Sequence, residues 1–355
     1  MKPLRVAVIG AGYWGPNLVR NLQSCPNTRL AWVCDLDEAR ARKAVGPYST
    51  VPVTDSLEMV LDDPRVEAVA IATPADTHTA LALKAFEADK HVLVEKPLAP
   101  SVAEGEQLVE EAAARGLTLM LDHTYCYTPA VRRIRELVEQ KVLGEIQYFD
   151  SIRVNLGLVK SDVDVFWDLA PHDLSILDFV IPGGFEAVAV SAHGIDPIGA
   201  GHPCLGYLTL NLSTGAIAHV TVNWLSPTKI RTTMIGGDRR IVVWDDLNPS
   251  QRLSMYDKSV AINGALTSDV KRERQVSYRV GDMIAPALTE AEALGGVVDE
   301  FAHAVREGRP SLTDGHSGLR VLSILEAAGR SLNVGGAPVP VTPVLSDTAQ
   351  VASVG

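Results

Sequence analysis

The chain has 355 residues, more than one hydrophobic core usually organises, so two domains are expected. Hydrophobic residues make up 46% of the chain and charged residues 21%, as in an ordinary globular protein, which excludes a disordered or collagen-like chain. The 43 acidic residues outnumber the 32 Lys and Arg residues, and no basic stripe gathers the cations, so nucleic acid is not expected as a partner.

In chain order, the first third alternates short apolar runs with segments of helical periodicity. The expected strands are residues 4–9, 30–35, 51–53, 68–72, 91–95 and 118–122. The expected helices between them are residues 17–24, 38–45, 56–61, 77–88 and 101–115. This alternation predicts a parallel sheet with crossover helices, forming one domain over residues 1–122.

After residue 122 the pattern changes to long stretches of two-residue alternation, which predict a mostly antiparallel sheet. The expected strands are residues 145–154, 187–193, 207–212, 216–224, 230–235, 240–243 and 275–280. The expected helices are residues 129–140, 168–180, 289–307 and 318–332. We therefore expect an α+β domain over residues 123–340, followed by a loose tail over residues 341–355.

The cysteines give no sign of a metal site or a disulfide framework. They are widely separated: Cys25, Cys34, Cys126 and Cys204. The chain enters a short apolar strand soon after Met1, and its longest uncharged stretch, residues 197–228, is interrupted by Gly, Pro, Asn and His. We therefore expect reduced thiols, no secretory signal, no membrane span and a cytoplasmic location.

A glycine-rich loop follows the first expected strand at once and opens the first expected helix. It consists of Gly10, Ala11, Gly12, Tyr13, Trp14 and Gly15. The first glycine permits a tight turn, the second lets backbone N–H groups approach a pyrophosphate, and the third lets the helix pack closely on the strand. This context predicts a dinucleotide site, although an ordinary glycine turn is the alternative.

Asp35, twenty-five positions after Gly10, ends the second expected strand. A carboxylate there accepts hydrogen bonds from the adenosine ribose and repels a 2′-phosphate, so NAD is favoured over NADP. Arg40 and Arg42 lie close enough in sequence to keep NADP as the less favoured choice. A helix cap is the alternative role for Asp35.

Three polar residues in two clusters are candidates for chemistry. Lys96 follows the strand over residues 91–95 at its carboxyl edge, where open α/β sheets bind ligands. Asp168 and His172 are four residues apart and share a helix face, and Pro171 indicates that Asp168 lies at the helix start. His172 is the expected base, Asp168 its orienting carboxylate, and Lys96 the group that stabilises an alkoxide. Taken singly, Lys96 also fits a surface lysine, Asp168 a helix N-cap, and His172 a half-buried histidine without a catalytic role.

Together with the glycine loop, three further motifs resemble the Gfo/Idh/MocA oxidoreductases over nearly the whole chain. These are Thr73-Pro74 with His78, Glu95-Lys96-Pro97, and the Asp168 and His172 pair. The resemblance implies a Rossmann domain followed by an open-faced antiparallel domain, an active site of Lys96, Asp168 and His172, and homodimers or homotetramers formed through the open sheet. It also places Tyr13, Trp14, Thr73, Pro74, His78 and Glu95 at the cofactor.

A narrower set of segments is similar to family members that act on UDP-N-acetylglucosamine or its uronic acid at C3. By that likeness Arg153, Asn155, His123 and Trp167 contact the sugar, although packing alone also explains Arg153. The implied reaction is NAD-dependent oxidation of a ring hydroxyl of a nucleotide sugar, with the keto product passed to an aminotransferase.

Several alternatives stay open, because the same three residues identify a reaction and not a substrate. A myo-inositol or free-sugar dehydrogenase is one, and a ketoreductase working in the reverse direction is another. A non-catalytic dinucleotide sensor is a third, which the intact Lys96, Asp168 and His172 set disfavours.

Overall fold

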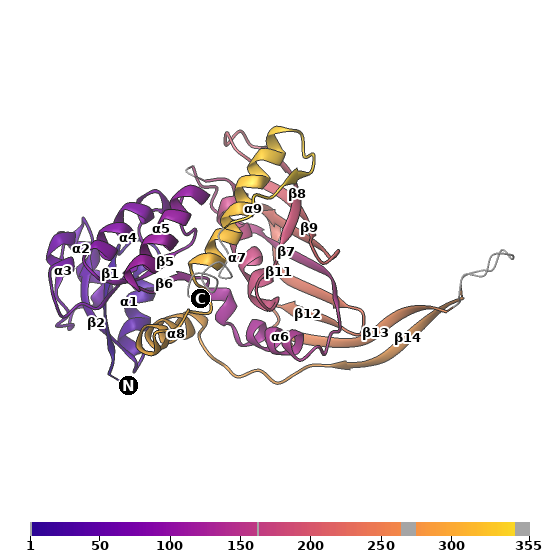
Figure 1. Cartoon of the computed structure of the whole chain (residues 1–355), viewed down its shortest axis with the longest axis horizontal. Coiled ribbons are helices and arrows are strands. Elements are labelled where there is room, and N and C mark those ends of the chain that lie inside the picture. Colours follow the sequence, from indigo (N-terminus) through magenta and orange to yellow (C-terminus); the bar gives the residue numbers. More distant parts are fainter. Residues whose placement is uncertain (1, 162, 264–274, 345–355) are drawn as a thin grey trace, which may run out of the picture.

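The computed structural model describes residues 2–161, 163–263 and 275–344. These residues form two units side by side, each built around one sheet (Figure 1). No helix within the described ranges is both long and apolar enough to cross a membrane. The expected tail over residues 341–355 lies outside the described residues from position 345 onward.

The first unit contains a six-stranded, fully parallel sheet in the order β3-β2-β1-β4-β5-β6, as expected. Its strands are β1 (Leu4–Ile9), β2 (Thr28–Cys34), β3 (Val53–Thr54), β4 (Ala68–Ile71), β5 (His91–Glu95) and β6 (Leu119–Asp122). Its helices are α1 (Gly15–Ser24), α2 (Glu38–Val45), α3 (Leu57–Leu61), α4 (His78–Glu87) and α5 (Val102–Arg115). The order reverses on either side of β1, so the loops after β1 and β4 face one crevice.

Local chemistry explains where these helices begin and end. The Asp37 carboxylate caps α2, and the Ser101 hydroxyl accepts a hydrogen bond from the N–H of Glu104 at the start of α5. Gly116 ends α5 with a φ of 64°, a left-handed conformation that favours glycine. The central strands are buried on both faces, which is why they read as continuous apolar runs.

The second unit contains a nine-stranded sheet in the order β14-β13-β12-β11-β7-β10-β9-β8-β15. Its strands are β7 (Ile146–Leu156), β8 (Ala187–Ile195), β9 (Leu205–Leu212), β10 (Ile217–Asn223), β11 (Leu225–Gly237), β12 (Ile241–Asp245), β13 (Leu253–Asn263), β14 (Gln275–Ile284) and β15 (Val339–Pro340). The described ladders are antiparallel except where β10 pairs with β7 in parallel. The strands β13 and β15 were not expected, and β13 and β14 extend away from the body of the molecule (Figure 1).

Helices cover one face of this sheet and also join it to the first unit. They are α6 (Pro129–Glu139), α7 (Val165–Val180), α8 (Ala293–Glu307) and α9 (Gly315–Asn333), with short 3₁₀ turns η1 (Ala75–Thr77) and η2 (Thr124–Tyr127) earlier in the chain. Helix α7 packs on β7 and β10, whereas α8 returns to pack against α1. Helix α9 contacts both α5 and α7, so one core continues through both units.

The start of α7 corrects a prediction. Asp168 was expected at the helix start with Pro171 in the first turn, but α7 begins three residues earlier, at Val165. The Asp164 carboxylate caps it by accepting hydrogen bonds from the N–H groups of Phe166 and Trp167. Pro171 therefore lies inside the helix and leaves the Trp167 carbonyl without its usual donor.

Candidate active site

The glycine loop between β1 and α1 has the shape that a dinucleotide requires. Gly10 has a φ of 95°, and a Cβ atom there would lie 2.8 Å from the backbone of Ala72. A Cβ atom at Gly15 would collide with the main-chain oxygen of Gly10, whereas one at Gly12 would meet nothing within 4 Å. Gly10 and Gly15 therefore serve chain packing, and Gly12 leaves the open space into which a pyrophosphate fits.

Asp35 binds the glycine loop directly. Its Oδ2 accepts a hydrogen bond of 2.6 Å from the N–H of Ala11, and its Oδ1 accepts one of 2.9 Å from the N–H of Asp37. Asp35 is thus not the helix cap, a task that Asp37 performs. The Arg40 side chain pairs with Asp37 at 3.3 Å, and the Asp35 carboxylate at the glycine loop suits NAD.

His78 has a different task from the expected contact with cofactor. Only 1% of its surface is exposed, and its Nδ1 and Nε2 lie 2.9 and 3.0 Å from the carbonyl oxygens of Pro97 and Thr73. The ring therefore lies between the loop after β4 and the loop after β5, and in its neutral form it donates a hydrogen bond to one of these two carbonyl oxygens. Thr73 itself shares a hydrogen bond of 2.7 Å with the Thr77 hydroxyl.

The ends of β5 and β6 form an acidic pair beside the glycine loop. The Trp14 indole N–H donates a hydrogen bond of 3.1 Å to Asp122, while Tyr13 projects into solvent. Burial, reinforced by the negative charge of Asp122, raises the pKa of Glu95 well above its usual range, although Lys96 opposes the shift. Glu95 therefore keeps its proton to a higher pH than an exposed glutamate does, and Trp14 donates to its neighbour Asp122.

Lys96 connects the two units at the carboxyl edge of the parallel sheet. Its Nζ donates a hydrogen bond of 2.8 Å to the main-chain oxygen of Asp168 on α7 and lies 3.5 Å from the carboxylate Oδ1 of the same residue. Lys160 donates to that Oδ1 at 2.7 Å, and the Trp224 indole donates to Oδ2 at 3.0 Å. One carboxylate therefore receives two ammonium groups and an indole N–H.

The protonation of this group follows from burial and charge. Burial lowers the pKa of Lys96, and Lys160 adds to the effect, whereas the Asp168 carboxylate opposes it. Burial acts to raise the pKa of Asp168, but the two lysines outweigh it and the pKa lies below its usual value. Asp168 is therefore ionised at neutral pH, and the cluster of one carboxylate and two ammonium groups carries a net positive charge.

His172 lies on the same face of α7, one turn after Asp168, but it is not the partner of that carboxylate. Its ring meets the edge of Tyr125 with the ring centroids 4.9 Å apart, and its Nδ1 is buried with no hydrogen-bond partner among the described residues. Burial lowers its pKa well below the usual range, and the positive charges of Lys96 and Arg153 add to the shift. The imidazole is therefore neutral and able to accept a proton.

Arg153 was expected to face a sugar, and the structure places it in an ion pair. Only 3% of its surface is exposed, and its Nε and Nη2 donate hydrogen bonds of 2.8 and 3.0 Å to Asp173. Ser151 donates to the same carboxylate, and the guanidinium lies 4.3 Å from the centre of the Tyr125 ring. Its Nη1 alone is buried without a partner in the described part of the chain.

The other three residues expected at the sugar differ in exposure. Asn155 on β7 and Trp167 on α7 are partly exposed. His123 is 2% exposed with neither ring nitrogen bonded in the described structure, and burial together with the charge of Lys96 lowers its pKa to about 3. His123 is therefore a neutral ring in the wall of the site, close to Lys96.

Sequence reasoning missed four residues that shape this site: Tyr125, Lys160, Asp173 and Trp224. Asp173 lies in the expected helix over residues 168–180 and Trp224 in the expected strand over residues 216–224, but the side chains that they contact come from distant parts of the chain.

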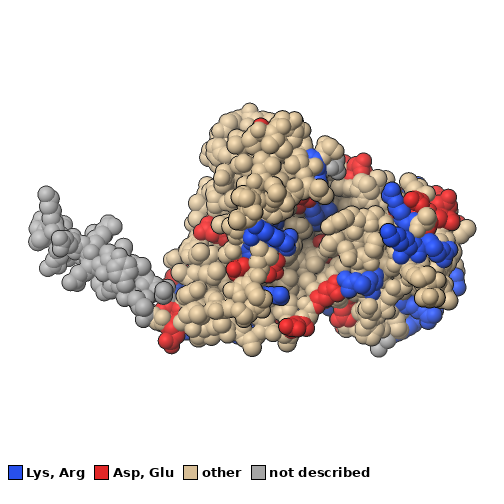
Figure 2. Space-filling model, turned by 180° about the vertical axis from the view of Figure 1, so that it is seen from behind, with Lys and Arg blue, Asp and Glu red and all other residues tan. Residues whose placement is uncertain are grey.

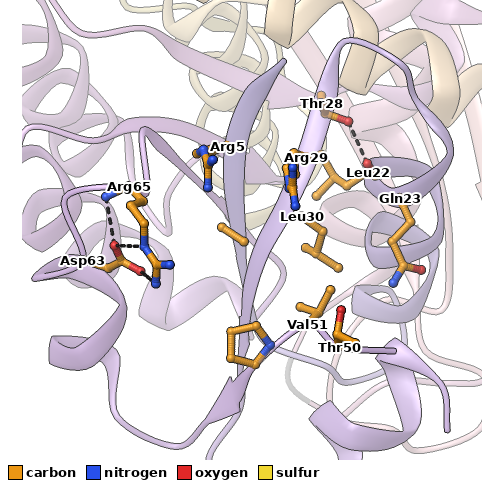
Figure 3. A pocket seen from close by; sticks show the side chains of 12 residues that line it. Arg5, Leu22, Gln23, Thr28, Arg29, Leu30, Thr50, Val51, Asp63 and Arg65 are labelled. Atoms are coloured by element: carbon orange, nitrogen blue, oxygen red, sulfur yellow. Dashed lines mark hydrogen bonds and ion pairs between the residues drawn. The ribbon is translucent and has the colours of Figure 1, made fainter. Parts of the chain in front are cut away.

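A separate pocket of about 360 Å³ lies near the other ends of β1 and β2, where Arg5 and Arg29 are register neighbours (Figure 3). It contains none of the site residues named above.

The fold and this geometry define a two-unit, dinucleotide-binding oxidoreductase. The chain matches a family model described as "Oxidoreductase family, NAD-binding Rossmann fold" over residues 4–123 and the GFO/IDH/MocA C-terminal domain over residues 131–242. It belongs to the Gfo/Idh/MocA family of NAD-dependent dehydrogenases, as its motifs predicted.

Relatives with different substrates are about equally similar. A UDP-N-acetylglucosamine 3-dehydrogenase of Acidithiobacillus ferrooxidans is 28% identical, over 90% of this chain and 94% of its own length. A myo-inositol 2-dehydrogenase of Thermotoga maritima is 23% identical, over 93% of this chain and 96% of its own. The crystal structure of GenD2 from gentamicin A biosynthesis, in complex with NAD, superposes with a TM-score of 0.79 at 26% identity over 97% of each chain.

Proposed function

We propose that this dehydrogenase oxidises a ring hydroxyl, at C3, of a nucleotide-activated hexose and reduces NAD. The observation that carries the proposal is the meeting of Lys96, from the edge of the parallel sheet, with Asp168 on α7, one turn before His172. The similarity to a UDP-N-acetylglucosamine 3-dehydrogenase supports the choice of substrate. The net positive charge around Asp168 suits a substrate that carries phosphate.

In this reaction NAD supplies the acceptor for the hydride. The lowered pKa keeps His172 unprotonated at neutral pH, so its imidazole is free to accept the proton of the reacting hydroxyl. Lys96 donates a hydrogen bond to the same oxygen and stabilises the negative charge that develops on it. Asp168 holds Lys96 in place through its main-chain oxygen, and not His172 as was expected from the spacing of the two residues.

The experiment is a turnover assay of purified protein with NAD and a panel of UDP-hexoses and UDP-hexuronic acids, following NADH. A sugar aminotransferase with its amino donor is added in parallel, because removal of the keto sugar draws the oxidation forward. Lys96→Met is the inactive control. NADH and a 3-keto product on a nucleotide sugar support the proposal, and their absence with and without the aminotransferase contradicts it.

A second candidate, oxidation of a polyol such as inositol, has a specific observation in its favour. A myo-inositol 2-dehydrogenase is similar over 93% of this chain. The same assay with myo-inositol, scyllo-inositol and free hexoses separates the two functions. Turnover confined to these compounds would assign the site to polyols.

We also propose a homodimer or homotetramer that forms through the open face of the nine-stranded sheet and passes its product to an aminotransferase. Ile152, Thr221 and Tyr207 are register neighbours on β7, β10 and β9, and Ile152 and Tyr207 are 40% and 46% exposed. The second unit presents few charged side chains on the face drawn in Figure 2. Exposed apolar residues in one row of a sheet are typical of an interface, and sedimentation of wild type and Ile152→Lys tests this one.

A further inference from the structure

Lys160 is a charged residue to which the proposed reaction assigns no step. It lies on the segment between β7 and α7, its side chain is 45% exposed, and its Nζ is 2.7 Å from Oδ1 of Asp168. Lys96 lies 3.5 Å from that same oxygen atom. An exposed ion pair contributes little to stability, so folding alone gives weak reason for a second lysine there.

The geometry divides the acceptor atoms of Asp168 between its donors. Lys160 takes Oδ1 at the shorter distance and the Trp224 indole takes Oδ2. Lys96 is left with the main-chain oxygen as its close acceptor, at 2.8 Å. Since an ammonium group has three N–H donors, Lys96 keeps donor capacity for another oxygen.

We propose that Lys160 is a positioning residue for Lys96: it holds the Asp168 carboxylate, leaves an N–H of Lys96 free for the reacting oxygen, and keeps a second positive charge beside it. The inference rests on the proposed function only in naming the oxygen that Lys96 meets. Direct contact between Lys160 and the substrate forms no part of it.

The remaining titratable groups around Lys96 come from four elements: Glu95 on β5, His123 after β6, His172 on α7 and His78 on α4. The three histidines have lowered pKa values and are neutral at pH 7, whereas the pKa of Glu95 is raised. Asp168 and Lys160 are the two charged groups with the largest effect on the pKa of Lys96, and Glu95 follows them. Lys160 lowers its pKa and Asp168 raises it.

The test measures the protonation of Lys96 without any substrate. The rate at which an amine-reactive anhydride modifies Lys96 is followed against pH by peptide mass spectrometry and normalised to the exposed Lys84. In Lys160→Met the Lys96 ammonium should keep its proton to higher pH, so at a fixed pH on the rising part of the curve its modification should slow severalfold. Lys160→Arg keeps the charge and should restore the wild-type rate.

Lys43→Met, which removes an exposed lysine on α2, is the matched control and should leave the curve unchanged. Lys160→Gln repeats the test with another neutral side chain, and NAD affinity verifies that each variant is folded. An unchanged Lys96 curve in Lys160→Met and Lys160→Gln would overturn the inference, as would the same change in Lys160→Arg or in Lys43→Met.

Turnover provides the second measurement. If a substrate is turned over, the alkaline limb of kcat/KM should move to higher pH in Lys160→Met, because Lys96 acts as its ammonium form. A merely structural role would lower kcat/KM without moving the limb. A changed Lys96 curve with no turnover of nucleotide sugars contradicts the proposed function alone, and turnover with an unchanged curve contradicts the role of Lys160 alone.

Discussion

The cofactor half and the substrate half of this site are built in different ways. The cofactor half is contiguous in sequence, since Gly10 to Gly15 form one loop and Asp35 closes it from the next strand. The substrate half joins residues far apart in the chain, with Lys96 on Asp168 and Trp224 on the same carboxylate. Local motifs therefore reveal a cofactor, whereas the roles of substrate-side residues depend on which partners they find.

We expect the greatest effect in the substrate half, where the buried ion pair of Arg153 and Asp173 stabilises the fold. Asp173→Asn leaves a guanidinium buried without its counter-charge, so we expect a loss of about 3–5 kcal/mol in the free energy of unfolding, measured by urea denaturation. The double variant Arg153→Met with Asp173→Leu removes both charges and should recover most of that loss. A single variant as stable as wild type would show that Arg153 does not depend on Asp173.

Lys96→Met separates the two halves by function. We expect kcat to fall by about 10²–10³-fold, because one donor to the developing alkoxide is lost. NAD affinity, measured by titration of protein fluorescence, should stay within about threefold of wild type, since Gly12 and Asp35 are the residues that we expect to hold the cofactor. Unchanged turnover would remove Lys96 from the mechanism, and a loss confined to NAD binding would assign it to the cofactor half.

The sequence predicted much of the fold because the signals were local. The parallel sheet follows from alternating apolar runs, and every expected strand of the first unit is present. The strand β13 was missed, and α7 was expected to begin at Asp168 because Pro171 looked like a first-turn residue. A proline inside a helix is tolerated here by tertiary contacts that sequence periodicity does not contain.

The candidate site was predicted in part. Lys96 and Asp168 do meet, but the spacing of Asp168 and His172 suggested a bond between them, whereas the carboxylate binds Trp224, fifty-six residues away. Arg153 was expected at the sugar by likeness to nucleotide-sugar dehydrogenases, and nothing local in the sequence distinguishes a free arginine from one paired across a strand and a helix. Pairings between residues that are distant in the chain become visible only in the three-dimensional structure.

A smaller effect tests the cofactor half alone. Asp35→Ala removes the acceptor of the Ala11 N–H and of the adenosine ribose, so NAD affinity should fall by about tenfold. Asp37→Ala is the matched control, because it removes the cap of α2 and should cost about 1 kcal/mol of stability with little change in NAD affinity. Equal losses of affinity in both variants would deny Asp35 a specific role.

An effect whose size depends on pH concerns the buried carboxyl group at the boundary of the two halves. The pKa of Glu95 is raised in the folded chain, so this group favours folding at low pH and that contribution is lost as pH rises toward the folded pKa. Glu95→Gln cannot ionise and should therefore gain stability relative to wild type as pH rises above about 4.3. Thermal melts of both proteins between pH 5 and 9, quoted as a difference in Tm, measure it; a constant difference would show that Glu95 is ionised.

The most direct measurement of the whole account is a crystal structure of the protein with NAD and a UDP-hexose. The account predicts that Lys96 Nζ and a ring nitrogen of His172 both lie within hydrogen-bond distance of one sugar hydroxyl, whose carbon faces the nicotinamide. A sugar bound with that hydroxyl on only one of the two groups, or with its reacting carbon turned away from the nicotinamide, would contradict it.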